Sequence, residues 1–320
     1  MVDIYLRTAD DDLSLDELAL YHLMMDYRAA EGLPTIPLSK ALTTTAGRHA
    51  LDTVENVGAY VGHAWSDAPY VSGDSSTYPA IWQAPQRLGT GYGGNGFEIS
   101  YGFGGAAVRT ATVDPARALA AWQASPGHDA VIVNEGPWWA PWEAIGLGIR
   151  AGVAHVWFGH VADPDVPTIM GMSAGDAVVG TAYGDIVKAG GGKDTVDGGD
   201  GDDRLTGSGG GDVLVGAGGD DTLLGGGGND VLAGGPGDDR LVGGRGRDVF
   251  VIEPGVGTDV IGDFRNRQDR IDLSDLPDVD GFGDLAVRRV WRDVVVEAGE
   301  ATIVIEATRR GAIDADDFLF

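Results

Sequence analysis

The chain has 320 residues, a formal net charge of −27 and no cysteine. This length can hold two domains, each with its own hydrophobic core. The negative charge is unfavourable for binding nucleic acid or an anionic membrane surface, and without cysteine no disulfide forms in any compartment. No apolar run is long enough to cross a bilayer, and the start of the chain lacks the basic and apolar segments of a cleavable signal peptide.

Two helices are predicted near the start of the chain. Ser14 and Glu17 have the spacing of a capping box that begins a helix, and Gly32 is a suitable residue to end it. After a proline-containing loop, Ser39 can cap a second helix that continues to about Asn56.

The region that follows predicts loops, then a helix and strands. Residues 57–112 are rich in glycine and aromatic residues and are expected to be mostly loop. Asp114 and Pro115 are a helix start, with Asp as the cap and Pro in the first turn. Three strand-like runs are then expected at residues 131–133, 145–149 and 154–158. Helices first and an antiparallel sheet later indicate an α+β layered domain, to which we assign residues 1–165.

Between Gly171 and Val251 an aspartate recurs every nine residues. The positions are Asp176, Asp185, Asp194, Asp203, Asp212, Asp221, Asp230, Asp239 and Asp248. Two residues after each aspartate stands one apolar side chain, and these are Val178, Val187, Val196, Leu205, Leu214, Leu223, Leu232, Leu241 and Phe250. A short fixed period with glycine, one acidic residue and one buried apolar residue is the signature of a solenoid.

The repeat predicts a parallel β-roll that binds calcium. Glycine-rich turns of six residues alternate with strands of three, whose middle side chain points inward. Two repeats complete one coil, so Asp194 stacks between Asp176 and Asp212. Such a column of carboxylates is repulsive until a cation lies between the coils, and calcium takes about six to eight oxygen ligands. We therefore expect the nine aspartates to bind several calcium ions.

The nonapeptide Gly-Gly-x-Gly-x-Asp-x-apolar-x resembles the calcium-binding repeat of the RTX (repeats-in-toxin) proteins. The best copies are GGDGDDRLT, GGGGNDVLA and GGPGDDRLV, at residues 198–206, 225–233 and 234–242. The resemblance implies a roll over residues 166–264. The alternative is a disordered Gly/Asp linker, which suits the composition. The strict register of the apolar position argues against disorder once calcium is bound.

The repeat register ends after Val251, since Gly257 stands where the next aspartate would fall. Residues 265–320 predict a β cap on the roll, with a hairpin formed by residues 294–296 and 302–305. The chain ends in Asp-Asp-Phe-Leu-Phe, which looks like the uncleaved signal of a type I secretion substrate. A last strand packed on the cap is the alternative, and both can hold. The resemblance implies a secreted, extracellular protein exported by a type I (ABC) secretion machinery.

Residues 14–160 resemble a second family. The segments are LMMDYRAAEGLPTIPLSKALTTTAGRHA, WQASPGHDAVIVN, IGLGI and VWFG, at residues 23–50, 122–134, 145–149 and 156–159. Together with the segment around His63 they are similar to the CAP (SCP) superfamily, in particular to its bacterial branch. The resemblance implies an α-β-α sandwich with a cleft.

In that family two histidines and two acidic residues line the cleft. The resemblance places His63 and His128 at the histidine positions and Glu98 at one acidic position. Glu98 stands in Gly-Phe-Glu-Ile, where the family has Gly-Glu-Asn-Ile, and the second acidic position is occupied by Ser125. The catalytic constellation is therefore incomplete, and the chain is not assigned to a class of enzymes.

The three cleft residues leave two functions open. Two imidazoles and a carboxylate can bind zinc at His63 and His128, or perform acid–base chemistry in a hydrolase. They can also be hydrogen-bonding struts in a domain that binds a lipid, glycan or protein ligand, which is the interpretation we favour. His49 is expected to be a packed core residue, and no partner is predicted for His155. Three tryptophans form a ligand-binding wall or cover the sheet edge, with covering favoured: Trp138, Trp139 and Trp142.

Overall fold

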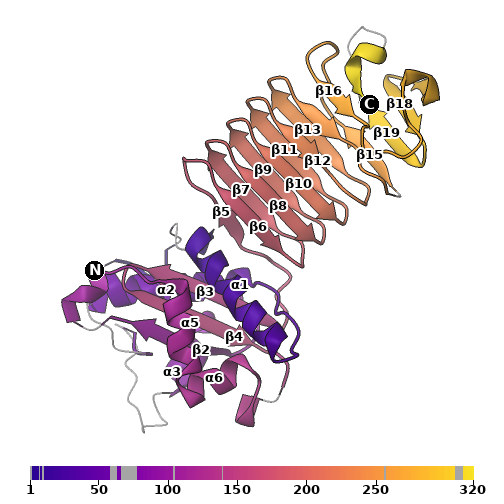
Figure 1. Cartoon of the computed structure of the whole chain (residues 1–320). Helices are drawn as coiled ribbons and strands as arrows, with labels where there is room; N and C mark the ends of the chain where they lie inside the picture. Colours follow the sequence, from indigo (N-terminus) through magenta and orange to yellow (C-terminus); the bar gives the residue numbers. More distant parts are fainter. Residues whose placement is uncertain are drawn as a thin grey trace. The chain divides into compact units, whose positions relative to one another are not determined.

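The computed structural model describes residues 2–6, 8, 11–57, 63–65, 78–103, 105–138, 140–255, 257–306 and 313–320. The chain divides into two compact units, Met1–Thr168 and Ile169–Phe320 (Figure 1). The first unit is a mixed α/β structure and the second is a parallel β-solenoid with a terminal cap. This agrees with the predicted order of an α+β region followed by a β-roll. Trp139 lies outside the described residues.

The first two helices begin at their predicted caps. A two-residue strand β1 (Leu13–Ser14) leads into helix α1 (Leu15–Ala30), where Ser14 and Glu17 form the capping box. Helix α2 (Lys40–Leu51) begins at Ser39, whose hydroxyl accepts a hydrogen bond from the N–H of Leu42, and it continues as a π-helical turn, Asp52–Val57.

A three-stranded antiparallel sheet completes the first unit. Its strand order is β2-β4-β3, and the strands are β2 (Gly96–Gly102), β3 (Ala144–Arg150) and β4 (Val153–Gly159). The remaining helices are α3 (Tyr78–Trp82), α4 (Ala84–Arg87), α5 (Pro115–Gln123) and α6 (Pro126–Ile132), with short 3-10 turns at Gly105–Arg109 and Gly136–Trp138.

The sheet lies between two helical layers, as the predicted α-β-α arrangement requires. Helix α2 covers one face, and α1 and α5 lie on the other (Figure 1). Gly146 and Gly148 of β3 allow the close approach of α2, because a Cβ atom there would collide with the helix backbone at Leu42 and Ala46. Every residue of the central strand β4 is buried, so the side chains of its two faces form the core of this unit.

Two local predictions for the first unit are wrong. Residues 131–133 were expected to be a strand, but they form the end of α6, which begins at Pro126. A short apolar run does not distinguish a strand from a buried helical turn, and Pro in the first turn favours the helix. The region 57–112 is not only loop, because it contains β2, α3 and α4. The many glycines and aromatic residues of this region suggested loop, although it contains the edge strand β2.

The solenoid of the second unit is built from strands that alternate between two sheets. One sheet has the order β5-β7-β9-β11-β13-β15-β19-β18-β17, and the other has the order β20-β16-β14-β12-β10-β8-β6. The roll strands are β5 (Thr168–Met170), β6 (Ala177–Thr181), β7 (Ile186–Gly191), β8 (Thr195–Asp200), β9 (Arg204–Gly209), β10 (Val213–Gly218), β11 (Thr222–Gly227), β12 (Val231–Ala233), β13 (Arg240–Arg245) and β14 (Val249–Val251).

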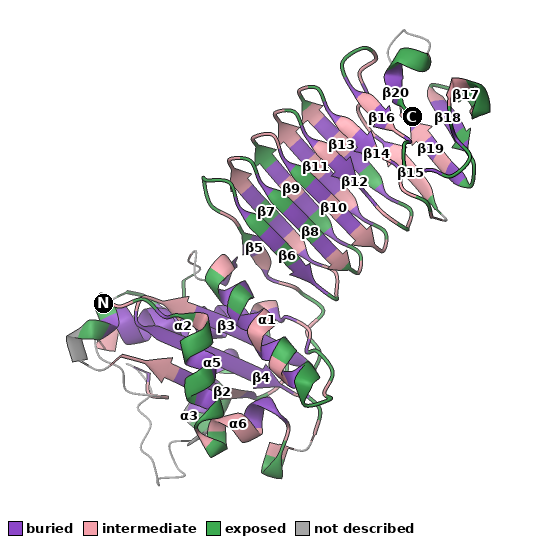
Figure 2. Ribbon diagram, viewed as in Figure 1, coloured by how far each residue is buried: buried purple, intermediate pink, exposed green. Residues whose placement is uncertain are grey.

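The stacking follows the predicted eighteen-residue register. Val213 pairs with Val231 and Thr222 with Arg240, both in parallel strands. The nine apolar repeat residues are all buried, with relative exposures of 2% or less, and they form the central stripe of the roll (Figure 2). The strands are mostly longer than the predicted three residues, because the extended backbone continues through the following glycines, as in β9.

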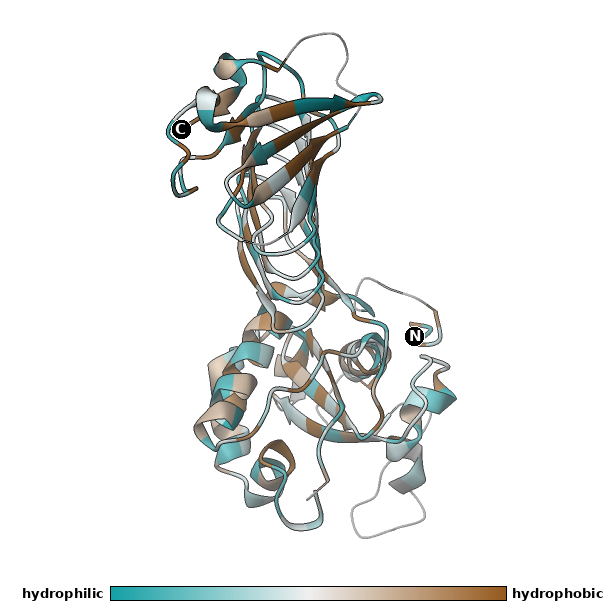
Figure 3. Ribbon diagram, turned by 90° about the vertical axis from the view of Figure 1, so that its right-hand side faces the viewer, coloured by the Kyte–Doolittle hydropathy of each residue, from teal (hydrophilic) through white to brown (hydrophobic). Residues whose placement is uncertain are grey.

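A cap covers the end of the roll. It contains β15 (Thr258–Ile261), β16 (Arg270–Asp272), β17 (Ala286–Val290), β18 (Asp293–Ala298), β19 (Ala301–Ile305) and β20 (Phe318–Leu319), with 3-10 turns at Phe282–Asp284 and Ala315–Asp317. The predicted hairpin is confirmed as β18 and β19, which turn at Gly299. The last strand, β20, pairs with β16, as the packing alternative predicted. The strands of the cap carry hydrophobic segments that close the core (Figure 3).

Candidate functional site

Two columns of buried aspartates run along the roll, and each precedes the strands of one sheet. All nine repeat aspartates have a relative exposure of 9% or less. In each column the backbone N–H of one aspartate donates a hydrogen bond to Oδ1 of the aspartate eighteen residues later, at 2.7–3.1 Å. These bonds fix one carboxylate oxygen of each stacked residue and aim the carboxylates along the axis of the roll.

The second carboxylate oxygen divides the aspartates into two groups. In seven of them Oδ2 is buried and has no hydrogen-bond partner among the described residues: Asp194, Asp203, Asp212, Asp221, Asp230, Asp239 and Asp248. In the first two, Asp176 and Asp185, Oδ2 accepts a hydrogen bond from the N–H of the residue four positions earlier, Met172 or Thr181, at 2.6 Å. The sequence predicted nine equivalent aspartates, but the structure makes only the interior seven alike.

The backbone conformation of the preceding loop also differs between the two groups of aspartates. In front of the seven aspartates, the residue four positions earlier has a positive φ: Gly190, Gly199, Ser208, Ala217, Gly226, Gly235 and Gly244. Met172 and Thr181 do not have this conformation, and their N–H groups reach the carboxylate. Ser208 and Ala217 hold it although side chains disfavour positive φ. An open carboxylate oxygen is therefore a feature of the regular coils.

The open oxygens lie in tight and electrostatically unfavourable surroundings. A Cβ atom on Gly207 would collide with Oδ2 of Asp212, so glycine at this position of the repeat makes room for the carboxylate. Burial raises the pKa of Asp203 to about 7 and that of Asp221 and Asp230 to about 6, against the stabilising effect of the N–H bond that each accepts. The charges of neighbouring column aspartates add to the increase.

The columns extend beyond the last regular repeat, which the sequence analysis missed. The N–H of Asp248 donates to Oδ1 of Asp269 at 3.1 Å, twenty-one residues on. Asp259 follows Asp239 in the other column, and burial together with the charge of Asp239 raises the pKa of Asp259 to about 7. The signal was present as an Asp-x-apolar triplet at both places, but insertions of two and three residues removed it from the nine-residue register.

A second cluster lies in the first unit, where Glu98 of β2 is surrounded by three histidines. Its Oε1 accepts hydrogen bonds from Nδ1 of His49 on α2, at 2.7 Å, and from Nδ1 of His155 on β4. Its Oε2 accepts a hydrogen bond from Nδ1 of His63, at 2.9 Å. The side chains of Glu98, His49 and His155 are fully buried, whereas that of His63 is 24% exposed.

Hydrogen bonds and ring stacking hold the buried imidazole of His49. His49 bonds from Nδ1 to the Glu98 carboxylate, at 2.7 Å, and from Nε2 to the carbonyl oxygen of Ala64, at 3.2 Å. It is stacked between Trp65 and His155, with centroid separations of 4.0 Å and 3.9 Å. Glu98 and His49 are thus a fully buried hydrogen-bonded pair.

Burial and hydrogen bonding shift the pKa values of the groups in this cluster. Burial would raise the pKa of Glu98, but the neighbouring imidazoles of His49 and His155 and their hydrogen bonds hold it well below its ordinary value. Burial and the charge of His49 lower the pKa of His155 to about 4, so that ring is neutral. Burial lowers the pKa of His63, but the hydrogen bond and charge of Glu98 outweigh it and leave a net increase. Burial and the charge of His63 lower the pKa of His128.

His63 and Glu98 line a cavity of about 240 Å³. Its other walls are apolar and aromatic: Ile81, Trp82, Phe97, Val131 and Trp138. Phe97 contacts Trp138 at a centroid separation of 5.0 Å. Trp142 is buried, stacks on His160 at 4.1 Å and donates its N–H to the carbonyl of Val131. The structure therefore divides the tryptophans, with Trp142 in the core and Trp138 on the cavity wall.

The structure brings some of the predicted residues together and adds two further histidines. His63 and Glu98 meet as expected, whereas His128 on α6 lies edge-on to His63, with a centroid separation of 6.5 Å. The hydrogen bonds of Glu98 among the described residues go to His49, His63 and His155. His49 is a buried core residue as expected, but it also bonds Glu98, and His155, for which no partner was predicted, bonds the same carboxylate. Nothing in their local sequence indicates a carboxylate brought from β2.

Comparisons with known proteins identify the roll. Residues 179–214 and 215–250 match the family model described as the RTX calcium-binding nonapeptide repeat. These segments are RTX repeats. The second unit is therefore a β-roll with calcium-binding RTX repeats, and these repeats carry the open aspartate oxygens described above. A search of the curated proteins found no match to the chain.

Solved structures with some similarity include two subunits of a mannuronan C5-epimerase of Azotobacter vinelandii. The R3 subunit of AlgE6 is 27% identical over 47% of this chain and 80% of its own, with a TM-score of 0.27. The R2 subunit is 27% identical over 48% and 91%, with a TM-score of 0.27. The extracellular lipase LipA of Serratia marcescens is 14% identical over 50% of this chain and 41% of the lipase, with a TM-score of 0.29.

The RTX repeats supply the oxygen donors that calcium prefers. Carboxylate oxygens and loop carbonyls are ligands for this cation, and a buried carboxylate oxygen without a partner is unfavourable unless a donor or cation reaches it. The seven interior aspartates meet this description, so the residues present fit calcium.

Within the described residues, no helix is long and apolar enough to cross a membrane.

The histidine cluster does not fit zinc in the same way. Ligand atoms of His49, Glu98 and His155 lie within 4.8 Å of one another. They are hydrogen-bonded to each other, however, and Nε2 of His49 bonds the carbonyl oxygen of Ala64, so zinc would have to displace these bonds. A catalytic zinc normally has three protein ligands, and at His63 and His128 the third candidate, Glu98, already accepts three imidazole N–H groups.

We expect the first unit to lose stability as the pH falls from about 6.5 to about 4. An unfolded imidazole binds its proton near pH 6.5, but His155 does so only near pH 4 when folded. The unfolded state therefore binds more protons than the folded state between pH 6.5 and 4. The free energy of unfolding is highest above pH 6.5 and decreases as the pH falls through this window. The pKa difference corresponds to about 3 kcal/mol.

Urea unfolding followed by near-UV circular dichroism, at several pH values in saturating calcium, measures this dependence. His155→Gln should flatten the pH profile, since glutamine can donate to Glu98 but does not titrate. His160→Gln is the matched control, because His160 hydrogen-bonds a backbone carbonyl in a more exposed position. Equal pH profiles for the wild type and His155→Gln would contradict the assignment.

Proposed function

We propose that this is a secreted protein whose roll folds when extracellular calcium binds between its coils. The observation that carries the proposal is the set of seven buried Oδ2 atoms without a partner, aligned in two columns. Calcium at these oxygens would replace repulsion between stacked carboxylates by attraction. The ligands that we propose are the nine repeat aspartates, with the interior seven contributing the most binding energy.

Calcium-dependent folding would also suit export. Extracellular calcium-binding modules bind at roughly 10⁻⁴–10⁻³ M, so the repeats would stay unfolded where calcium is scarce. An unfolded chain suits passage through the type I (ABC) secretion machinery, which we propose as the route. Binding to the folded state alone would then stabilise the protein outside the cell by mass action.

The calcium sites are tested by stoichiometry and affinity. Asp212→Asn removes a carboxylate with an open oxygen from the middle of one column. It should lower the number of ions bound, measured by equilibrium dialysis, and weaken calcium-induced folding. Asp197→Asn is the matched control, because Asp197 is an exposed strand residue and its loss changes the net charge equally. If both variants bind calcium like the wild type, the column aspartates are not the ligands.

For the first unit we propose a CAP-like domain that binds a ligand in its cavity without catalysis. Aromatic side chains line the cavity, and flat aromatic surfaces suit an acyl chain, the apolar face of a sugar or an apolar peptide side chain. His63 and Glu98 add a polar wall. The ligand class is thus a lipid, glycan or protein segment with one apolar and one polar side.

A hydrolase is the second candidate, favoured by the hydrogen bond of 2.9 Å between His63 and Glu98. A carboxylate that holds one imidazole nitrogen fixes the ring orientation and raises its basicity, as in acid–base catalysis. His63 would act as the general base toward a water or substrate hydroxyl in the cavity. His128, edge-on to His63, would complete the polar wall.

One pair of variants separates the two candidates. His63→Ala with His128→Ala should abolish hydrolysis of ester, glycoside and peptide substrates if the first unit is an enzyme, whereas a binding domain shows no such activity in the wild type. Loss of ligand retention with unchanged folding supports the binding domain. Metal analysis of the purified protein should find calcium without stoichiometric zinc. One zinc per chain, lost in the double variant, would contradict our interpretation of the cluster.

A further inference from the structure

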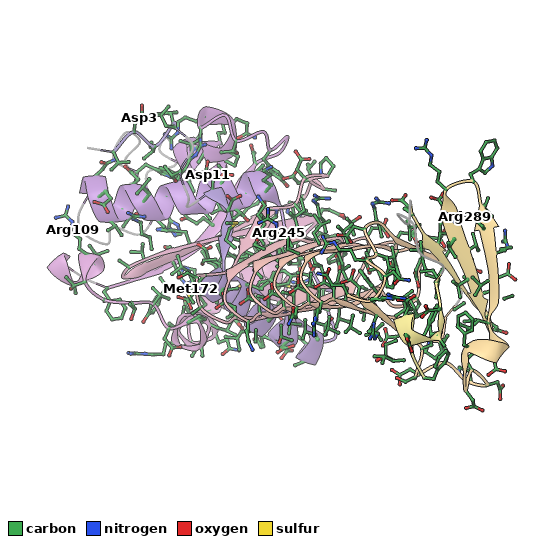
Figure 4. The ribbon with its side chains drawn as sticks, turned by 90° about the horizontal axis from the view of Figure 1, so that it is seen from above. Asp3, Asp11, Arg109, Met172, Arg245 and Arg289 are labelled. Carbon is green, nitrogen blue, oxygen red and sulfur yellow. The ribbon has the colours of Figure 1, made fainter. Side chains whose placement is uncertain are left out.

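The hairpin β17–β18 of the cap carries an unusual set of exposed side chains. Trp291, at its turn, has a relative exposure of 95%, and Val287 and Val290 of β17 are 40% and 37% exposed. The same seven-residue segment, 286–292, holds three arginines and no acidic residue. Figure 4 marks Arg289 on this hairpin. The hairpin 286–298 has three arginines against two acidic residues, Asp293 and Glu297, so in a chain with a net charge of −27 it is a local surface of slight positive charge with exposed apolar side chains.

The conformation of Trp291 adds a second, independent observation. Its φ is 61°, a left-handed value that bulky side chains rarely adopt. The fold gains little from an indole that is almost entirely in water, and the turn holds it in a disfavoured backbone conformation. The two-residue turn between Val290 and Asp293 requires a positive φ, for which glycine or asparagine is the usual residue, so the hairpin holds an exposed tryptophan where a smaller residue would fit better.

The charges on the hairpin are available to a partner. Arg288 forms an exposed ion pair with Glu297, at 3.1 Å, whereas Arg289 and Arg292 make no ion pair with a described residue. Among the described strands β17 is the last of its sheet, so its outer edge pairs with no other described strand. At physiological salt, charges further than about 8 Å away are screened, so an approaching surface is attracted by the hairpin and not repelled by the whole chain.

We propose that this hairpin is a docking surface for an anionic lipid bilayer. Tryptophan is the side chain that most favours the membrane–water interface, and arginines near an anionic membrane surface are each worth about a fivefold increase in binding. Trp291 would enter the headgroup region, Val287, on the same face of β17 as Arg289, would add apolar contact, and Arg289 and Arg292 would contact lipid phosphates. The charge of the surface and its exposed indole together favour a lipid surface over a soluble partner.

The test is co-sedimentation of the full chain with vesicles in saturating calcium, where the roll is folded. We compare vesicles of phosphatidylcholine alone with vesicles that also contain phosphatidylglycerol. The wild type should bind only the second kind, and added salt should weaken binding. Arg289→Glu with Arg292→Glu should lower the partition coefficient by at least about twentyfold. Glutamate keeps the edge strand charged, so protection of that edge from aggregation is retained.

Matched variants separate this surface from the rest of the protein. Arg204→Glu with Arg245→Glu changes the net charge equally at exposed positions of the roll and should leave vesicle binding intact. Brominated phosphatidylcholine should quench a fraction of the tryptophan fluorescence that is missing in Trp291→Phe. Vesicle binding that survives in both the hairpin and indole variants would overturn the proposal. So would no vesicle binding by the wild type, including the case in which it is retained on an anionic polysaccharide instead.

Discussion

Removal of calcium is expected to unfold the RTX roll. In a chelator, the seven open oxygens of the column aspartates are buried without a cation or donor, and stacked carboxylates repel each other along both columns. The far-UV circular dichroism of the β-structure in residues 171–264 should be lost, and millimolar calcium should restore it. At a concentration one hundred times the Kd, each independent site adds about 2.7 kcal/mol to the stability of the folded state.

Acidification provides a control for the cause of this unfolding. The folded pKa values of Asp203 and Asp221, about 7 and 6, lie above the ordinary value near 3.8. The folded roll therefore binds more protons than the unfolded chain between these values, and its stability without calcium increases as the pH falls through 7 and 6. Chelated protein should regain β-structure at about pH 5. A roll whose spectrum is indifferent to both chelator and pH would show that the columns do not control folding.

Replacement of Glu98 by glutamine is expected to destabilise the first unit by about 1.5–3 kcal/mol, the contribution of hydrogen bonds to a charged group. The variant replaces the buried carboxylate that bonds His49, which is stacked between Trp65 and His155, by a neutral amide. It also removes an acceptor for three imidazole N–H groups, of which the amide oxygen can replace only part. Thermal or urea unfolding in saturating calcium, followed by tryptophan fluorescence, measures the change while the roll stays folded.

Glu55→Gln is the matched control for this variant. Glu55 forms an ion pair with Arg150 at 3.1 Å, and both side chains are more than one third exposed. Such a pair contributes at most about 1 kcal/mol, so this variant should unfold almost like the wild type. Equal effects of the two substitutions would mean that Glu98 does not carry its charge in the folded state.

The repeats were predictable because their rules are local. A buried apolar residue every nine positions, with glycine between, determines the strand, the turn and the eighteen-residue stacking without any distant contact. The same reasoning ended at Val251, because it required a constant period. Asp259 and Asp269 continue the columns across insertions that only the pairing of β15 and β16 reveals.

The first unit was predictable where the signals lie close to the elements they control. The capping residues Ser14, Ser39 and Asp114 begin helices as expected. The strand at residues 131–133 was wrong, because three apolar residues fit a helical turn equally well. The strand β2 was missed although residues 97–101 alternate apolar and polar side chains, because the glycine-rich sequence on both sides of this short run suggested a loop.

The sequence by itself determined a calcium-binding roll in the second half of the chain, since every coil repeats the same short-range pattern. Only the tertiary structure decided which aspartate oxygens are open, because this depends on the φ of a loop residue four positions away. It also decided that His49 and His155 meet Glu98. These residues lie on α2, β4 and β2, and no local pattern links positions about fifty residues apart. Packing of the helix on two glycines of the sheet brings the three side chains together.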